Sequence, residues 1–201
     1  MFISFEGIDG CGKSTQIELL KNNLIAHKKQ VLTLREPGGT SFAEEIREIL
    51  LHSEHKLSRE SELFLFESAR ADLVSKIIKP ALNEGKIVLC DRFFDSTTAY
   101  QGYGRGLDVE TIIIINQFAT QGLKPDLTFY LHVSLETSNL RTGNKKKDKI
   151  ENSGDGFFAR VVEGYLDLCK KEPQRFIEIN AEGNIEETGR KILKIIENKL
   201  L

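Results

Sequence analysis

The sequence predicts an α/β fold: a five-stranded parallel sheet flanked by helices, with a mobile lid. Short apolar runs alternate with longer segments of helical periodicity, as in repeated β-α-β units. The short runs are apolar throughout rather than at alternate positions, which is typical of strands buried on both faces of a sheet. Residues 142–156 are polar, charged and punctuated by glycine, which indicates a loop that projects from the body.

The predicted elements follow one another in a regular order. The expected strands cover residues 2–6, 31–35, 87–90, 127–133 and 176–179. The expected helices cover residues 13–27, 41–51, 59–83, 109–120, 136–141, 157–171 and 185–200. In the last helix apolar side chains recur near helical spacing, so one of its faces packs on the sheet. A proline and the sequence "NEG" at 83–85 end the third helix before the third strand.

Length and charge limit the class of protein. No internal repeat or low-complexity linker divides the chain, so we expect a single domain over residues 1–201 with a lid at about 142–156. With 28 basic and 30 acidic residues the formal charge is −2, without the basic excess typical of nucleic-acid binders. No stretch approaches the roughly 20 apolar residues of a membrane helix. Neither nucleic acid nor a membrane is therefore an expected partner.

Two features favour a cytoplasmic location. The N-terminal sequence "MFISFEGIDG" lacks the basic start and the long apolar run of a signal peptide. The cysteines, Cys11, Cys90 and Cys169, are odd in number, widely spaced and without a C-x-x-C pair. Such cysteines fit a reducing compartment.

Residues 7–14, "GIDGCGKS", match the phosphate-binding pattern G-x-x-x-x-G-K-[ST] between an expected strand and an expected helix. Gly7, Gly10 and Gly12 allow successive backbone N–H groups to point inward at a phosphate chain. Lys13 adds a positive charge near the β- and γ-phosphates, and the Ser14 hydroxyl is a magnesium ligand. The motif predicts that the chain binds a nucleoside triphosphate.

A second acid and two absences narrow the class of enzyme. The apolar strand in "KIVLCDR" ends in Asp91, where a carboxylate holds magnesium in such sites. A GTPase requires N-K-x-D, but "NKKKD" at 144–148 is one residue too long, and no D-x-x-G follows the third strand. A nucleic-acid motor is normally larger or basic. We therefore expect a small kinase that holds ATP and a second, phosphate-bearing substrate.

A second cluster lies in "LFLFESARADL" (63–73) and "DRFFDSTTAYQGYGRGL" (91–107). Arg70 and Arg92 can each hold a phosphate or a base edge with a planar, multi-donor group. Phe66 lies four residues before Arg70 on a predicted helix, so the two side chains share one face. An aromatic ring and an arginine on one face suit a flat base, although a core phenylalanine and a surface charge are the alternative.

These stretches, with "FEGIDGCGKST" (5–15), "REPGGT" (35–40), "KPDLTFYL" (124–131) and "FFARVVEGYLDL" (157–168), resemble the thymidylate kinase family over nearly the whole chain. The resemblance implies a P-loop kinase fold with a lid, usually as a homodimer. It implies the reaction ATP + dTMP → ADP + dTDP with Mg²⁺ as cofactor. A kinase for another nucleoside monophosphate or for a deoxynucleoside is the alternative, and a nucleotide-dependent switch is the alternative outside enzymes.

For the thymine base, the resemblance implies that Phe66 stacks on the ring and that Arg70 hydrogen-bonds its O4 atom. Thr97 and Gln101 belong to the stretch that reads the base. Tyr100 would occupy the space beside C2′ and disfavour a ribose hydroxyl by steric exclusion. A purely structural role is the alternative for Thr97.

For the sugar and the phosphates, the resemblance implies that Asp9 lies by the 3′-hydroxyl and that Arg92 clamps the dTMP phosphate, with Arg35 or Glu36 nearby. Arg141 and the loop 180–184 would enclose adenine. A structural role is the alternative for Glu36 and for that loop. The expected ATP-binding residues are Gly7, Ile8, Asp9, Gly10, Cys11, Gly12, Lys13, Ser14, Thr15 and Arg141.

The lid departs from the family pattern. Family members place a catalytic arginine in the P-loop, where this chain has Gly10, or in a lid motif resembling G-E-L-D-R-x-E. The lid here reads "KKKDKIE", with Lys149 at the position of that arginine. Lysine keeps the charge but loses the bidentate fork. We expect Lys13, Arg92 and Lys149 to supply catalytic charge, with Arg141 or Arg160 sharing the role of Lys149, and the lysines at 145–147 to be a solvated charge run.

Overall fold

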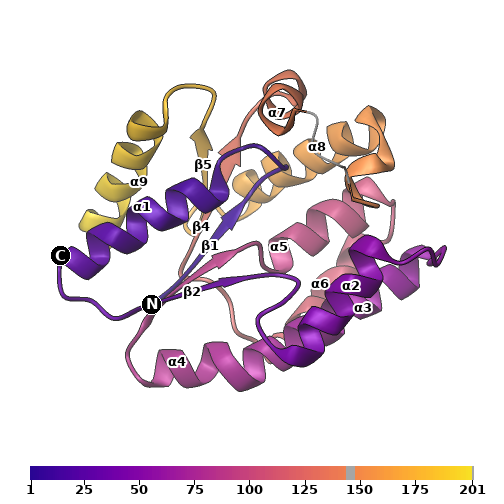
Figure 1. Cartoon of the computed structure of the whole chain (residues 1–201), viewed down its shortest axis with the longest axis horizontal. Coiled ribbons are helices and arrows are strands. Elements are labelled where there is room, and N and C mark those ends of the chain that lie inside the picture. Colours follow the sequence, from indigo (N-terminus) through magenta and orange to yellow (C-terminus); the bar gives the residue numbers. More distant parts are fainter. Residues whose placement is uncertain (144–147, 201) are drawn as a thin grey trace.

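The computed structural model describes residues 1–143 and 148–200, built around a five-stranded sheet in the order β2-β3-β1-β4-β5 (Figure 1). The strands are β1 (Phe2–Glu6), β2 (Val31–Arg35), β3 (Ile87–Asp91), β4 (Leu127–His132) and β5 (Phe176–Asn180). All neighbouring strands pair in parallel, so the predicted sheet is confirmed, with the last three strands ending one residue away from expectation. Phe5 of β1 lies beside Asp91 and Phe129, so the carboxyl ends of these strands share one edge.

Helices cover both faces of the sheet (Figure 1). The helices α1 (Lys13–Ala26) and α9 (Ile185–Leu200) pack against each other on one face. The other face carries α4 (Lys79–Asn83) and α8 (Asp155–Lys171). The remaining helices are α2 (Ser41–His52), α3 (Arg59–Leu73), α5 (Phe94–Thr97), α6 (Val109–Ala119) and α7 (Leu135–Thr142). In the described part of the chain, no helix has the length and apolar content needed to cross a bilayer.

The helix expected over residues 59–83 is continuous, but one segment in it is a π-helix rather than an α-helix. A π-helical segment, Val74–Ile78, separates α3 from α4. It ends next to Pro80, which has no N–H to continue the α-helical hydrogen-bond ladder. Val74 and Ile78 are fully buried against the sheet, so packing compensates for the irregular turn. From α3, Phe66 and Arg70 reach the cavity at the carboxyl edge of the sheet.

Sequence analysis did not predict a helix between β3 and α6, and the structure has one there. It comprises α5 and a π-helical segment, Thr98–Gly104. Threonine and glycine are poor helix formers, so local propensity gives no indication of it. Tertiary contacts hold it, because α8 packs so closely that a Cβ on Gly164 would lie 2.7 Å from the Tyr103 ring. Asn116 of α6 also donates to the Thr98 hydroxyl over 3.0 Å.

The expected lid, residues 142–156, is described only in part. A short 3₁₀ helix, Glu151–Ser153, precedes α8, and Ile150 beside it is buried in the core. The lysines at 145–147, expected to be a solvated charge run, lie outside the described residues. That expectation, and the mobility of the lid, remain predictions.

Candidate active site

The loop between β1 and α1 is folded so that only glycine fits at two of its positions. Gly7 has a φ of 137° and Gly10 a φ of 76°, both strained for residues with a Cβ. A Cβ on Gly7 would lie 2.7 Å from the Leu131 carbonyl oxygen, and a Cβ on Gly10 would lie 2.9 Å from the Ser138 carbonyl oxygen. The loop is therefore packed against β4 and α7, and this packing leaves no room for an arginine at position 10.

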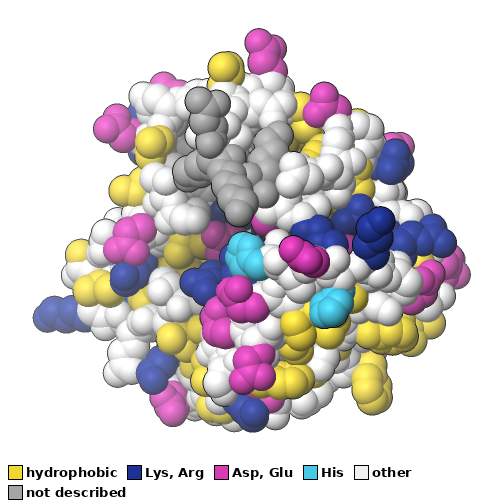
Figure 2. All heavy atoms as spheres, turned by 45° about the vertical axis from the view of Figure 1, so that its right-hand side comes forward, with side chains coloured by type: hydrophobic (Ala, Val, Ile, Leu, Met, Phe, Trp, Pro, Cys, Tyr) yellow, Lys and Arg dark blue, Asp and Glu magenta, His cyan; other side chains and the backbone are white. Residues whose placement is uncertain are grey.

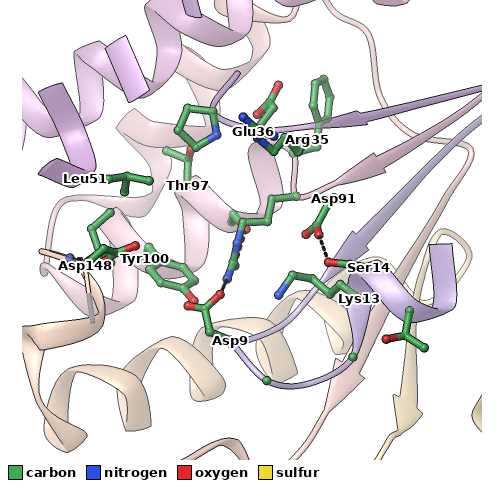
Figure 3. A pocket seen from close by; sticks show the side chains of 18 of the residues that line it. Asp9, Lys13, Ser14, Arg35, Glu36, Leu51, Asp91, Thr97, Tyr100 and Asp148 are labelled. Atoms are coloured by element: carbon green, nitrogen blue, oxygen red, sulfur yellow. Dashed lines mark hydrogen bonds and ion pairs between the residues drawn. The ribbon is translucent and has the colours of Figure 1, made fainter. Parts of the chain in front are cut away.

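Two side chains at the start of α1 contact the phosphate-binding loop and the end of β3, respectively. The Lys13 Nζ donates to the Gly7 carbonyl oxygen over 2.9 Å and to the Ile8 carbonyl oxygen over 3.2 Å. The Ser14 hydroxyl donates to Asp91 Oδ2 over 3.0 Å (Figure 3). Hydroxyl and carboxylate oxygens are the hard donors that Mg²⁺ prefers. The structure thus brings together the two residues predicted as magnesium ligands, and their donor atoms fit that ion.

A cavity of about 860 Å³ opens at this edge of the sheet (Figure 3). Acidic and basic side chains and a histidine lie close together on this side of the molecule (Figure 2). The predicted site residues that line the cavity are Asp9, Gly10, Gly12, Lys13, Ser14, Thr15, Arg35, Glu36, Phe66, Arg70, Asp91, Arg92, Thr97, Tyr100, Gln101 and Arg141. The predicted residues Gly7, Ile8, Cys11 and Lys149 do not line it. Ile8 and Cys11 are instead buried in the hydrophobic core, where they anchor the loop.

Arg92 projects into the cavity from the residue after β3. Its Nη2 donates to Asp9 Oδ1 over 2.9 Å, and its guanidinium carbon lies 5.1 Å from the centroid of the Tyr100 ring. Burial alone would raise the pKa of Asp9, but the positive charges of Arg92 and Lys13 outweigh it and hold that pKa below its usual value. Three cations, Lys13, Arg92 and Arg141, and two carboxylates, Asp9 and Asp91, line this end of the cavity, which leaves it a net positive charge for phosphate.

The opposite end contains a buried arginine between two carboxyls. Phe66 and Arg70 both reach the cavity from α3, so the prediction that they share a face is confirmed. The Arg70 Nε donates to Glu36 Oε2 over 2.8 Å, and its Nη1 pairs with Glu67. Burial raises the pKa of Glu36 to about 7. The positive charge of Arg70 lowers this pKa and the negative charge of Glu67 raises it, but burial has the largest effect. The positive charge of Arg70 is therefore largely balanced within the protein.

Some polar atoms around this end of the cavity have hydrogen-bond partners within the protein, and others have none. The Gln101 amide donates to Glu62 Oε1 over 2.9 Å, and Glu62 also pairs with Arg105 over 3.0 Å. Within residues 1–143 and 148–200, Thr97 Oγ1 and Glu36 Oε1 are buried without a hydrogen-bond partner. Buried polar atoms are normally paired, so a polar ligand in the cavity would satisfy them.

Arg141 marks the far side of the phosphate-binding loop. Its Nη2 donates to the Ala181 carbonyl oxygen over 3.0 Å and to the Glu182 carbonyl oxygen over 3.1 Å. Residues 183–185 line the cavity next to it. The structure thus brings Arg141 together with the end of the loop that was expected to enclose adenine.

The structure does not bring two of the three candidates for the role of the lid arginine, Lys149 and Arg160, into the cavity, whereas the third, Arg141, lines it. The Lys149 ammonium donates to the His55 carbonyl oxygen, and its backbone N–H donates to the Leu51 carbonyl oxygen over 3.4 Å. The Arg160 guanidinium donates to the Gly104 carbonyl oxygen over 2.8 Å. The residues on either side of Lys149 line the cavity instead.

Three polar residues that line the cavity, Arg47, Ser96 and Asp148, were not predicted as site residues from the sequence. The Arg47 Nη1 donates to the Pro37 carbonyl oxygen over 2.9 Å, which turns the arginine toward the site. Its position on α2 could have indicated this, because it lies four residues from both Ala43 and Leu51 on the buried face. Ser96 lies in the helix that was not predicted, so nothing local pointed to it.

Comparisons with known proteins agree with this geometry. Residues 5–192 match the family model described as "Thymidylate kinase". The chain is 49% identical to a thymidylate kinase of Chlorobaculum parvum, over 98% of this chain and 95% of that one. It is 47% identical to a thymidylate kinase of Kosmotoga olearia, over 96% and 94%. The crystal structure of thymidylate kinase from Ehrlichia chaffeensis superimposes with a TM-score of 0.80 at 38% identity, covering 98% of each chain.

Proposed function

We propose how the residues of this cavity carry out the reaction of the thymidylate kinase family, to which the chain belongs. The chain transfers a phosphoryl group from ATP to dTMP and forms dTDP. The observation that carries the assignment of roles is that one cavity holds both the phosphate-binding loop and the cluster around Arg70. Donor and acceptor can therefore meet in one site, as an in-line transfer requires.

The dTMP end of the site is the end that contains Arg70. Phe66 stacks on thymine, and Arg70 donates to its O4 atom. Thr97 contributes its unpaired hydroxyl, and Gln101 extends the same wall. Arg70, Thr97 and Gln101 are buried, Phe66 is partly buried, and all four line the cavity, which supports this orientation.

The sugar and the acceptor phosphate lie between the two ends. Asp9 faces the 3′-hydroxyl, and Tyr100 fills the space at C2′. Arg92 clamps the phosphate of dTMP, with Glu36 at the border to the base. The pairing of Arg92 with Asp9 over 2.9 Å and the Tyr100 ring beneath it support this placement.

The ATP end is the loop at the start of α1. Backbone N–H groups of residues 7–15 and the Lys13 ammonium bind the phosphates, and Arg141 with the loop after β5 encloses adenine. Ser14 and Asp91 hold Mg²⁺, which supplies positive charge for the β- and γ-phosphates when bound. The hydrogen bond between Ser14 and Asp91 supports their action as a pair.

This arrangement needs no general base. The acceptor oxygen of a phosphate is already ionised at neutral pH, so the protein has to place it and to screen charge. Lys13 and Arg92, which both line the cavity beside Asp9, place the phosphates and screen their charge. Arg141 and Lys149 add charge when residues 142–156 act as a lid over the site, which also excludes water.

We further propose a cytoplasmic homodimer. Phe64 on α3 and Ile114 and Phe118 on α6 are 59%, 68% and 86% exposed, although all three are large and apolar. These two helices contact each other, and exposed apolar surface of this kind commonly marks an interface. Three free cysteines, Cys11, Cys90 and Cys169, support a reducing compartment.

A coupled assay of ADP release tests the assignment of roles. With ATP and Mg²⁺, we expect strong turnover of dTMP, weaker turnover of dUMP and little turnover of AMP, CMP or GMP. Chelating the metal with EDTA abolishes turnover, and Lys13→Ala serves as the inactive control. Equal turnover of dTMP and CMP would contradict the roles of Phe66 and Arg70, and turnover without metal would contradict those of Ser14 and Asp91.

A further inference from the structure

A buried carboxyl group, that of Glu6, contacts the segment that follows Arg92, the proposed phosphate clamp. Glu6 is the last residue of β1 and is fully buried. Its Oε1 accepts the backbone N–H of Phe93 over 2.7 Å. Its Oε2 accepts the Ser96 hydroxyl over 2.5 Å and the Tyr165 hydroxyl over 3.0 Å. Both of its oxygens are thus engaged by the segment that begins at Arg92.

The backbone of Arg92 is in an unfavourable conformation. Its φ is +69°, one of three positive values among the non-glycine residues that the structure describes. This left-handed conformation is unfavourable for a residue with a side chain. The Arg92 N–H donates to the Phe5 carbonyl oxygen over 2.9 Å, and the next N–H along the chain, of Phe93, is the one that Glu6 accepts. Residues of β1 therefore hold both sides of the strained position.

The same carboxyl also orients the Arg92 side chain. Ser96 has a single hydroxyl hydrogen, and Glu6 accepts it. The Ser96 oxygen keeps two lone pairs, so it can accept from Arg92 Nη1, which lies 3.3 Å away, even where its other lone pair faces the Tyr165 hydroxyl at 2.9 Å. With Nη2 on Asp9, the guanidinium is fixed at two points above the Tyr100 ring.

These contacts do not require Glu6 to be charged. Burial raises the pKa of Glu6 to about 8, and the negative charge of Asp95 adds to this effect. A neutral carboxyl group still has lone pairs on both oxygens, so it can accept from the backbone and from a hydroxyl together. An amide of the same shape cannot do this, because its NH₂ group only donates.

We propose that Glu6 is a positioning residue that holds Arg92 in its strained conformation, with the guanidinium aimed at the acceptor phosphate. This inference rests on the proposed role of Arg92, and it adds to that role a residue that does not touch substrate. Without Glu6, the buried N–H of Phe93 lacks an acceptor and the backbone at Arg92 can relax. The guanidinium then leaves the place where it meets phosphate.

A double-mutant cycle with Glu6→Gln and Arg92→Ala tests the proposal. We expect Glu6→Gln to lower kcat/KM for dTMP by about 10²-fold, as a misplaced catalytic group can, with the KM for ATP unchanged. In the Arg92→Ala background the same substitution lowers kcat/KM by less than about twofold, because the group that it positions is gone. A residue that only supports the fold would cause the same loss in both backgrounds.

Asp126→Asn is the matched control. Asp126 Oδ2 accepts the backbone N–H of Phe2 over 2.7 Å, at the end of β1 that is far from Arg92. This substitution also converts a carboxylate that binds a backbone N–H of the sheet into an amide. We expect kcat/KM for dTMP to stay within about twofold of the unsubstituted protein.

Each result of the cycle decides one question. An equal loss in both backgrounds, or a loss under threefold from Glu6→Gln alone, overturns the positioning role of Glu6. A small loss from Arg92→Ala itself overturns the proposed role of Arg92, which is a separate failure. If Glu6→Gln does not fold, the cycle is run with Ser96→Ala, and here too only a loss that depends on Arg92 supports the proposal.

Discussion

Two of the arginines that line the cavity, Arg70 and Arg92, are held in opposite ways. Arg70 is 2% exposed and lies between Glu36 and Glu67, so its charge is balanced by the protein. Among residues 1–143 and 148–200, Arg92 forms an ion pair with one carboxylate, Asp9, at a site that also contains the Lys13 ammonium. The end of the cavity that contains Arg70 is therefore close to neutral, and the end that contains Arg92 is positive.

This difference matches the two parts of a nucleotide. A base carries no charge, so an arginine that reads it needs a fixed direction more than a free charge, and two carboxyls provide that direction. A phosphate is dianionic, and an arginine that clamps it must keep most of its positive potential. The balanced charge of Arg70 thus suits the base of the nucleotide, and the largely unbalanced charge of Arg92 suits its phosphate.

The largest effect is expected at the positive end. Replacing Arg92 by alanine removes the clamp and its charge, and we expect kcat/KM for dTMP to fall by about 10³-fold. Arg92→Lys keeps the charge without the planar fork, so it recovers only part of that loss. Steady-state kinetics with varied dTMP measure both. A lysine variant as active as the unsubstituted protein would show that charge alone is needed here.

At the neutral end, Glu67→Gln tests whether the orientation of the Arg70 guanidinium matters, without removing the arginine itself. The change deletes one of the two ion pairs that orient Arg70, and we expect the KM for dTMP to rise roughly tenfold while kcat changes less than twofold. Glu60→Gln is the control, because Glu60 is an exposed residue of the same helix. An effect of Glu67→Gln on kcat rather than on KM would contradict the division of the cavity into a reading end and a reacting end.

The same contrast explains what the sequence could predict. The phosphate-binding loop and the end of β3 are local patterns, and Ser14 and Asp91 meet because parallel strands share one carboxyl edge. The helix at 94–104 has no local pattern. It is stabilised by α8 and α6, which lie far along the chain, so Ser96 could not be placed beforehand.

Side-chain direction was the least predictable property. Lys149 occupies the expected position in the sequence, yet its ammonium donates to the His55 carbonyl oxygen, which lies 94 residues away along the chain. Arg70 was predicted to face a ligand, but nothing in the spacing showed that Glu36, the residue after β2, would approach it. Contacts between distant segments decided both.

Lys149 offers a smaller test of the positive end. We expect Lys149→Ala to lower kcat about fivefold, because a lid cation stabilises the charge of the transferring phosphoryl group. The KM for dTMP should not change, since the base lies at the other end. Lys191→Ala, an exposed lysine on α9, is the control. Unchanged turnover in Lys149→Ala would leave Arg141 as the cation that serves this role.

The two ends also differ in how protons affect stability. Burial raises the pKa of Glu36 from 4.5 to about 7, so the folded state binds a proton more tightly than the unfolded state. Its contribution to the free energy of unfolding is therefore largest below about pH 4.5 and is lost as the pH rises to about 7. The pKa of Asp9 is lowered in the folded state, so Asp9 has the opposite effect on stability. Its contribution to the free energy of unfolding is present at neutral pH and is lost as the pH falls through its folded-state pKa.

Urea denaturation at pH 5, 6 and 7 separates these contributions. In Glu36→Gln the stability should fall less steeply with pH than in the unsubstituted protein, by up to about 1.4 kcal/mol per pH unit, the limit for one proton. Asp9→Asn should leave the slope in this range unchanged, because Asp9 is ionised throughout it. Equal slopes for Glu36→Gln and the unsubstituted protein would mean that Glu36 is also ionised throughout. The neutral end would then carry a negative charge, and Arg70 would read the base from within an acidic site.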